Sequence, residues 1–290
     1  MDLSVWNNKG TFFRHKAHQI FTIDEGEGEV LLLVHGFPTA SWDWWKMWDG
    51  LLMKHRLVAL DMIGFGFSDK PSGYPYSIFD QADIIEALLA SKEIDSVHIL
   101  CHDYGDTVGQ ELVARFNERK RSQSDGITIK SVCMLNGGLF PEVHRPLLIQ
   151  KVLMSPLGYF VSRMFTREKL GRNFRKTSGP QTQPSDEELN SFWELMTHNG
   201  GKEVFHLLIR YIKERAQNRD RWVGALQDAD MPLRFINGSL DPISGKHMAE
   251  RYKEIIPNPD VIELAEIGHY PSFEAPAIVL KHYLKFRDGI

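Results

Sequence analysis

The sequence predicts an α/β fold with a mostly parallel central sheet and a helical insertion between two of its strands. Short apolar runs of strand length alternate along the chain with segments that repeat apolar residues at helical spacing. This alternation stops over residues 140–223. The chain has 290 residues, of which 42% are hydrophobic, which is enough for one core domain and a smaller insertion.

The predicted strands are short runs rich in Leu and β-branched residues, a composition typical of strands buried inside a parallel sheet. They are Val30–Val34, Leu57–Leu60, Val97–Cys101, Ile129–Leu135, Leu233–Ile236 and Val261–Leu264. Helical periodicity is found at Ile78–Ala90, Thr107–Phe116 and Pro276–Phe286. Strands that alternate with helices in this way predict a sheet with helices on both faces.

Residues 140–223 contain no convincing strand. They hold helix-compatible segments, among them Glu187–Met196 and Glu203–Arg215, and loop signals at Ser178–Pro180 and Asn199–Gly201. We therefore expect a helical cap over 140–223, inserted into a core domain made of 1–139 and 224–290.

The net charge of −4 gives no global positive field that would attract nucleic acid. Two local basic clusters, Arg115–Arg121 and Arg163–Lys176, are interpreted as solvated helix faces or loops. The first 21 residues lack the apolar segment of a signal peptide, and the run Val30–Val34 is far too short to span a membrane. We expect a soluble, cytoplasmic protein.

The two cysteines, Cys101 and Cys133, lie in predicted strands and are flanked by apolar residues. A buried, reduced pair is expected, which fits a reducing compartment. Neither cysteine has a CxxC partner or a spaced pair of histidines, so we expect no metal site, and no cofactor either.

Four motifs follow predicted strands. They are His35–Pro38, Asp61–Ser68, Cys101–Gly105 and Gly268–Tyr270. In the third, Asp103 stands at the turn from a strand into a helix, where many enzymes of this shape hold a serine within G-x-S-x-G, a motif that is absent here. A carboxylate can attack an sp³ carbon and form an alkyl-enzyme ester. The alternative for Asp103 is a simple helix N-cap.

The set HGFP, D-x-x-G-F-G-x-S, H-D-Y-G and a late G-H resembles the epoxide hydrolase and haloalkane dehalogenase branch of the α/β-hydrolase fold. The stretches Phe65–Pro71, Cys101–Asp106 and Arg221–Ala225 are similar to the mesoderm-specific transcript proteins within that branch. The resemblance extends from about Leu31 to the C-terminus. It implies an α/β-hydrolase fold and a hydrolase whose nucleophile is Asp103.

The resemblance also implies the partners of Asp103. His269 would be the general base that activates water against the ester. Asp241, which follows a predicted strand, would orient His269, although a turn residue before proline is the alternative. The backbone N–H groups of Phe37 and Tyr104 would form the oxyanion hole.

Two substrate classes remain open, and both are small apolar molecules. Opening an epoxide needs a proton donor, for which Tyr211 in the cap is the first candidate and Tyr159 the second. A haloalkane needs N–H donors for the departing halide, which the resemblance places on a Trp after the nucleophile. Tyr104 stands there, so Trp193 or Trp222 would have to serve. We favour the epoxide.

Two further functions are alternatives to these hydrolases. The chain could be a binding or regulatory protein that keeps the fold without turnover, because a fold does not prove a function. A serine esterase is disfavoured because the residue at the strand–helix corner is not serine. The sequence does not determine the natural substrate, its stereochemistry or the oligomeric state.

Overall fold

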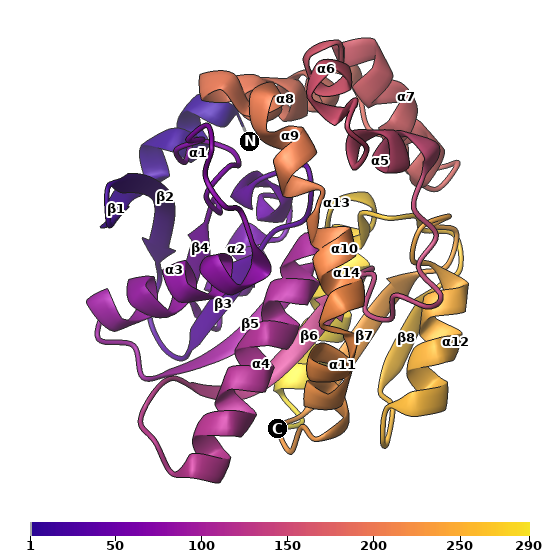
Figure 1. Ribbon diagram of the computed structural model, residues 1–290. Coiled ribbons are helices and arrows are strands. Elements are labelled where there is room, and N and C mark those ends of the chain that lie inside the picture. The colour runs from indigo at the N-terminus through magenta and orange to yellow at the C-terminus, as the bar shows by residue number, and fades with distance from the viewer. Residues whose placement is uncertain (1) are drawn as a thin grey trace.

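The computed structural model describes residues 2–290 and contains a single eight-stranded sheet with helices on both faces (Figure 1). The strands are β1 (Thr11–His15), β2 (His18–Glu25), β3 (Val30–Val34), β4 (Arg56–Leu60), β5 (Ser96–His102), β6 (Thr128–Leu135), β7 (Leu233–Gly238) and β8 (Val261–Leu264). Their order in the sheet is β1-β2-β4-β3-β5-β6-β7-β8. Strand β2 pairs antiparallel with β1 and β4, and all other neighbours are parallel. The predicted mostly parallel sheet is confirmed.

All six strands expected from apolar runs are present within two residues of their predicted ends. The hairpin of β1 and β2 was not predicted. Strand β1 lies at the edge of the sheet and has no fully buried residue, so its sequence shows no apolar run. Its existence depends on pairing with β2, which a local reading of the sequence does not detect.

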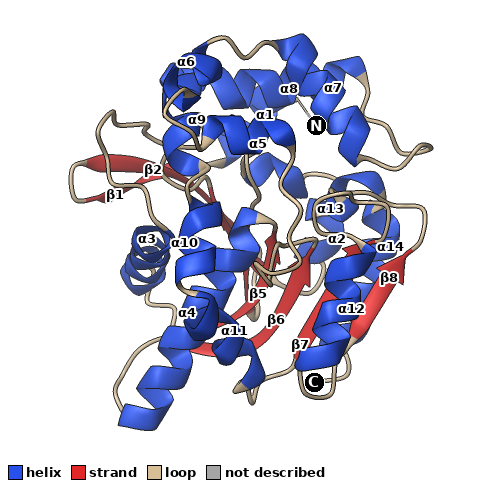
Figure 2. Cartoon of the chain, turned by 45° about the vertical axis from the view of Figure 1, so that its right-hand side comes forward, coloured by secondary structure: helices blue, strands red, loops and turns tan. Residues whose placement is uncertain are grey.

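The helices fill the connections between strands. They are α1 (Leu3–Lys9), α2 (Trp48–Leu52), α3 (Ile78–Ser91), α4 (Tyr104–Ser122), α5 (Leu148–Leu153), α6 (Gly158–Arg163), α7 (Arg167–Thr177), α8 (Asp186–Thr197), α9 (Gly201–Leu208), α10 (Tyr211–Gln217), α11 (Arg219–Gln227), α12 (Lys246–Ile255), α13 (Pro271–Glu274) and α14 (Pro276–Arg287), with 3₁₀ turns at Ser41–Trp44 and His198–Gly200. Helices α3, α4 and α11 pack together on one face of the sheet, and α2 and α14 lie on the other (Figure 2).

Seven helices, α5 to α11, lie between β6 and β7. Figure 1 shows α5 to α9 beyond one end of the sheet, whereas α10 and α11 run back along α4. The helix-compatible segment Glu203–Arg215 is divided between two helices, with a break between α9 and α10. At this break the N–H of Arg210 bonds to the carbonyl of Leu207, and the N–H of Ile212 to that of Ile209. These tighter 3₁₀-type bonds turn the chain just before Tyr211.

The parallel strands β3, β5, β6, β7 and β8 all point their carboxyl ends toward the cap. Loops that follow parallel strands meet at one edge of the sheet, and ligands of α/β proteins bind outside that edge. The segments after these strands therefore converge beneath the cap, although they are far apart in the chain.

Candidate active site

Asp103 stands at the corner between β5 and α4 in a conformation that side chains rarely adopt, with φ of 48° and ψ of −102°. The sharp turn brings the start of α4 close to the backbone at the end of β3. A Cβ atom on Gly105 would lie 2.3 Å from the carbonyl oxygen of Val34 and 2.7 Å from that of His35, so glycine is required where α4 passes β3. The strained backbone projects the Asp103 carboxylate out of the sheet edge, which is a common feature of functional residues.

The two oxygens of the Asp103 carboxylate have different donors. Oδ2 accepts a hydrogen bond from the backbone N–H of Phe37 at 3.1 Å. Oδ1 accepts one from the hydroxyl of Tyr211 at 3.2 Å. The side chain is almost fully buried, with only 4% of the residue exposed. One oxygen is thus held by the core domain, and the other faces a residue of the segment between β6 and β7.

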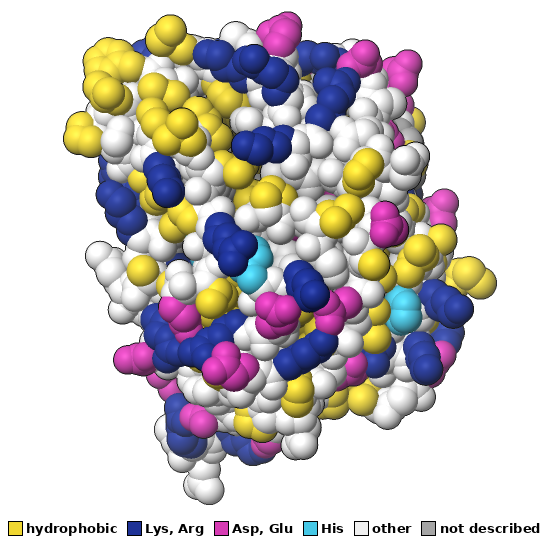
Figure 3. Space-filling model, turned by 90° about the vertical axis from the view of Figure 1, so that its right-hand side faces the viewer, with side chains coloured by type: hydrophobic (Ala, Val, Ile, Leu, Met, Phe, Trp, Pro, Cys, Tyr) yellow, Lys and Arg dark blue, Asp and Glu magenta, His cyan; other side chains and the backbone are white. Residues whose placement is uncertain are grey.

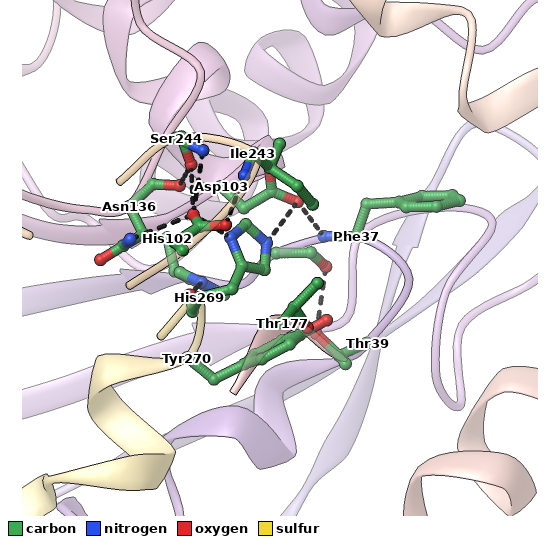
Figure 4. A network of polar contacts seen from close by, with 12 residues as sticks. Phe37, Thr39, His102, Asp103, Asn136, Thr177, Ile243, Ser244, His269 and Tyr270 are labelled. Atoms are coloured by element: carbon green, nitrogen blue, oxygen red, sulfur yellow. Dashed lines mark hydrogen bonds and ion pairs between the residues drawn. The ribbon is translucent and has the colours of Figure 1, made fainter. Parts of the chain in front are cut away.

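His269 lies between the carboxylates of Asp103 and Asp241. Figure 4 shows His269 close to Asp103, with Asn136 and Ser244 beside it. Its Nδ1 is 2.7 Å from Oδ2 of Asp241. Its Nε2 is 3.9 Å from Oδ2 of Asp103, which is too far for a direct hydrogen bond but close enough for a water-sized reactant to lie nearby. The structure therefore brings together Asp103, His269 and Asp241.

Asp241 is fixed by four donors besides His269. Oδ1 accepts from the N–H of Ile243 at 2.8 Å, and Oδ2 from the N–H and hydroxyl of Ser244 at 3.1 and 2.7 Å. The amide of Asn136 adds a bond to Oδ2 at 3.1 Å. These bonds orient a carboxylate that accepts from Nδ1 of His269 and so directs Nε2 toward Asp103.

The three groups also set one another's charge. Burial alone would neutralise His269, but the nearby carboxylates of Asp241 and Asp103 raise its pKa well above the usual value. Burial opposes ionisation of Asp103 too, yet the charge of His269 holds the pKa of this carboxyl well below its usual range. The pKa of Asp241 is lowered as well, against burial, by the charge and hydrogen bond of His269. Each group therefore favours the charged form of its neighbours: the carboxylates favour a protonated His269, and His269 favours ionised carboxylates.

Tyr211 is held from behind by a buried cation. The guanidinium of Arg215 lies 4.8 Å from the centre of the Tyr211 ring, and its Nε and Nη2 donate to the hydroxyl oxygen of Thr107 at 2.9 and 2.7 Å. Burial and the charge of Asp103 raise the pKa of Tyr211 well above its usual value, and Arg215 opposes that rise. The phenol is therefore protonated and able to donate.

An apolar cavity lies between the cap and the sheet edge. It encloses about 610 Å³, part of it open to solvent, and Phe37, His269 and Tyr270 line its core side. Its cap side is formed by apolar side chains, among them Leu153, Phe165, Leu170, Phe174 and Phe205. This volume and lining suit a small apolar molecule with few polar groups.

Comparison with known proteins matches residues 29–124 to the family model described as alpha/beta hydrolase fold. The chain is 44% identical to the mesoderm-specific transcript homolog protein of Bos taurus, over 98% of this chain and 87% of that protein. It is 27% identical to the cis-3-alkyl-4-alkyloxetan-2-one decarboxylase of Shewanella oneidensis, over 96% and 88%. A loop variant of a haloalkane dehalogenase from Bradyrhizobium elkanii superimposes with a TM-score of 0.79 at 20% identity, over 97% of this chain and 96% of that one.

The chain belongs to the α/β-hydrolase superfamily. The resemblance to the mesoderm-specific transcript proteins, first found in short motifs, is confirmed over nearly the whole sequence of this α/β hydrolase. The names of the relatives specify different reactions. Membership therefore identifies this chain as a hydrolase of the superfamily, and its substrate has to be inferred from the residues of the site.

Three residues that the sequence suggested for the site of this α/β hydrolase lie elsewhere. Tyr159 is 40% exposed and its hydroxyl contacts Arg163 instead of Asp103. Nε1 of Trp222 donates to Oε2 of Glu111 at 2.8 Å. Trp193, partly buried, is not among the residues that line the cavity. Tyr104 lies in the site as the first residue of α4. The centre of its ring is 4.7 Å from that of the Tyr211 ring.

No motif marks Asn136, Ser244 or Arg215, and no functional role was predicted for them. Asn136 follows β6 with a positive φ of 43°, and its side-chain oxygen also accepts from the backbone N–H of Gly238 at 2.6 Å. Nε2 of His102 lies 2.7 Å from the carbonyl oxygen of His269. A polar residue directly after a parallel strand is the one signal that could have identified Asn136.

Across residues 2–290, no cluster of three His, Cys, Asp or Glu side chains is arranged to bind a metal ion. No helix in that part of the chain is both long and apolar enough to cross a bilayer. Cys101 and Cys133 are both buried and form no disulfide.

Proposed function

We propose that this α/β hydrolase opens epoxides through an alkyl-enzyme ester on Asp103 and releases vicinal diols. The observation that carries the proposal is the hydrogen bond of 3.2 Å between the Tyr211 hydroxyl and Oδ1 of Asp103. It brings a proton donor to the oxygen that is free to attack, because Oδ2 is already bound by the N–H of Phe37. An epoxide needs both groups at one place, the nucleophile at carbon and the acid at oxygen.

In the first half-reaction Oδ1 of Asp103 forms a bond to an epoxide carbon, and the bond between that carbon and the ring oxygen breaks. The ring oxygen takes the proton of the Tyr211 hydroxyl. The products are a hydroxyalkyl ester of Asp103 and a tyrosinate. The buried cation of Arg215, 4.8 Å from the ring, stabilises the negative charge that develops on Tyr211.

In the second half-reaction Nε2 of His269 takes a proton from water, and the hydroxide adds to Cγ of Asp103. The negative charge on Oδ2 is stabilised by the N–H groups of Phe37 and Tyr104. Collapse of this intermediate breaks the bond between Cγ and Oδ1, which leaves with the diol. The acid formed on Asp103 supplies the proton of the departing alkoxide, and the proton on His269 returns to Tyr211 through solvent.

Alkylation also prepares the base. Two carboxylates face His269 and raise its pKa. When Asp103 becomes a neutral ester, one of these charges disappears, so the pKa of His269 falls and the ring releases its proton to solvent more readily. The neutral imidazole is then able to take a proton from water. The same step that creates the ester thus makes its hydrolysis possible.

The haloalkane alternative uses the same three groups, but its leaving group needs N–H donors. Trp222 already donates to Glu111, and the Asp103 carboxylate accepts its hydrogen bonds from Phe37 and Tyr211. The hydroxyl of Tyr211 is the donor that faces Asp103. The contacts therefore favour an oxygen leaving group, which agrees with the Shewanella oneidensis relative, whose name specifies an oxetanone, also a strained oxygen ring.

The test is capture of the covalent intermediate. His269→Gln retains the alkylation step and removes the base, so a panel of terminal epoxides should leave a mass increment equal to the substrate on the peptide that contains Asp103. Asp103→Asn is the matched control and should acquire no adduct. In H₂¹⁸O, a single turnover of the native protein should leave the label in Asp103, not in the diol.

Labelled diol in that single turnover would mean that water attacks the epoxide directly, and Asp103 would not be the nucleophile. An adduct formed from a bromoalkane much faster than from any epoxide would support the dehalogenase. No adduct and no turnover with epoxides, haloalkanes or oxetanones would favour a silent binding protein.

A further inference from the structure

The cap bears an unusual concentration of exposed apolar side chains, which we call the α5–α6 surface. It consists of Leu148, Leu157, Tyr159, Phe160 and Met164, with exposed fractions between 40% and 78%. These five are among only eleven large hydrophobic residues that are exposed within residues 2–290. Figure 3 shows a cluster of hydrophobic side chains at the cap end of one face, with Lys and Arg side chains beside it.

Such clustering is not required by the core. Helix α6 already buries Gly158 and Ser162 and packs against α9, and α5 buries Leu153. The large side chains of Leu148 and Phe160 instead point away from that packing, with 78% and 64% of their surfaces exposed. Apolar patches of this kind on soluble domains mark interaction sites.

The segment that contains the α5–α6 surface is strongly basic. Residues 147–177 contain seven Lys or Arg and one acidic residue, Glu168, although the whole chain has a net charge of −4. Lys151, Arg172 and Lys176 have no carboxylate within ion-pair distance anywhere in residues 2–290. The apolar side chains are therefore accompanied by cations that the fold does not neutralise.

The α5–α6 surface adjoins the cavity of the site. Leu148 is exposed on α5, whereas the neighbouring residues Leu147, Ile149 and Leu153 line the cavity. One short helix thus separates the apolar exterior from the apolar interior.

We propose that the α5–α6 surface docks this protein on anionic lipid bilayers. The apolar side chains enter the boundary between headgroups and acyl chains, and the unpaired cations contact the headgroups. The combination favours an anionic bilayer over a protein partner, because the large apolar side chains lie in a segment with seven basic residues and one acidic residue, and three of the cations have no carboxylate partner within residues 2–290. The proposal is independent of the reaction assigned to Asp103.

The test is flotation of the purified protein with vesicles of phosphatidylcholine, with or without phosphatidylserine. The protein should bind the vesicles that contain phosphatidylserine, and binding should weaken as salt is raised. Leu148→Glu/Phe160→Glu should lower partitioning about tenfold or more, because two large apolar side chains no longer insert. Met53→Glu/Ile278→Glu is the matched control, since these residues are 85% and 47% exposed in other elements, and it should bind like the native protein.

A second pair of variants tests the charges. Lys151→Gln and Arg172→Gln should each reduce binding to vesicles with phosphatidylserine by about fivefold and hardly affect thermal unfolding. No binding to either vesicle, or equal binding by the Leu148→Glu/Phe160→Glu variant, would overturn the proposal. So would a dimer of the native protein in sedimentation that this variant abolishes, because the surface would then be covered by a second copy of the chain.

Discussion

The hydroxyl of Tyr211 donates to Oδ1 of Asp103 at 3.2 Å, although 108 positions separate the two residues in the chain. Tyr211 is the first residue of α10, which lies between β6 and β7, and Asp103 directly follows β5. This bond joins the inserted helices to the sheet edge at the one oxygen of Asp103 that the N–H of Phe37 does not hold. The proton transfer proposed for epoxide opening depends on this contact between Tyr211 and Asp103.

Tyr211→Phe should slow enzyme alkylation by an epoxide about 10²–10⁴-fold, because the leaving alkoxide loses its proton donor. Hydrolysis of an ester already formed should change little, since His269 and the N–H of Phe37 act in that step. Rapid-quench single turnovers with one terminal epoxide and one bromoalkane measure both. Equal slowing with the bromoalkane would contradict an acid role, because a halide leaves without a proton.

Asp103→Asn should lower the pKa of His269, because the variant removes one of the two carboxylates that raise it. A histidine whose pKa is raised on folding stabilises the protein below its unfolded pKa, and this contribution is lost as pH rises through the folded value. The variant should therefore lose that stabilisation at a lower pH than the native protein.

The measurement is NMR titration of the histidine ring protons, with unfolding by urea at several pH values. Partly exposed histidines far from the site, such as His282, serve as an internal control and should titrate identically in both proteins. An unchanged titration of His269 in Asp103→Asn would mean that Asp241 alone determines the charge of His269. That result would contradict the proposed coupling between ester formation and activation of the base.

Arg215→Met should slow alkylation on the order of tenfold, because the cation that stacks 4.8 Å from Tyr211 no longer stabilises the tyrosinate. Arg215→Lys keeps the positive charge and is therefore the control for its removal. In a Tyr211→Phe background the same change should have almost no further effect, since the phenol through which Arg215 acts is gone. Additive losses in the double variant would show that Arg215 acts on substrate or on folding instead.

Asp106 should limit stability at neutral pH. It is fully buried in the first turn of α4, its Oδ1 accepts a long bond of 3.4 Å from the N–H of Leu135, and its Oδ2 has no hydrogen-bond partner. Burial raises the pKa of its carboxyl to about 7. The folded state therefore binds a proton that the unfolded state releases near pH 3.8, and stability declines as pH rises between these values.

Asp106→Asn should flatten this part of the pH profile and stabilise the protein above about pH 7 by a few kcal/mol, on the order of the cost of a shifted buried carboxyl. Urea unfolding at about pH 5 and about pH 8 measures the effect. Asp125→Asn, in the loop after α4, is the control. Equal pH dependence in Asp106→Asn and the native protein would show that Asp106 is not the group responsible.

The six strands from β3 to β8 could be predicted from sequence because each contains a short apolar run, and in β3, β4 and β5 every residue after the first is buried. The segments that follow these strands contain Asp103, Asp241 and His269, and parallel pairing requires their loops to meet at one edge. The edge hairpin of β1 and β2 was not predicted, because β1 has no buried residue and leaves no apolar run, although Ile20–Ile23 of β2 are buried.

Only the tertiary structure decided which distant side chains meet that edge. Tyr159 and Tyr211 both lie in the predicted insertion 140–223, but the turn between α9 and α10 brings the hydroxyl of Tyr211 to Asp103, while Tyr159 remains on the surface. Asn136 contacts Asp241 because β6 and β7 are neighbours in the sheet. Sequence patterns report whether a residue is buried, whereas the contacts it makes there depend on how separate elements pack, and no local pattern records that.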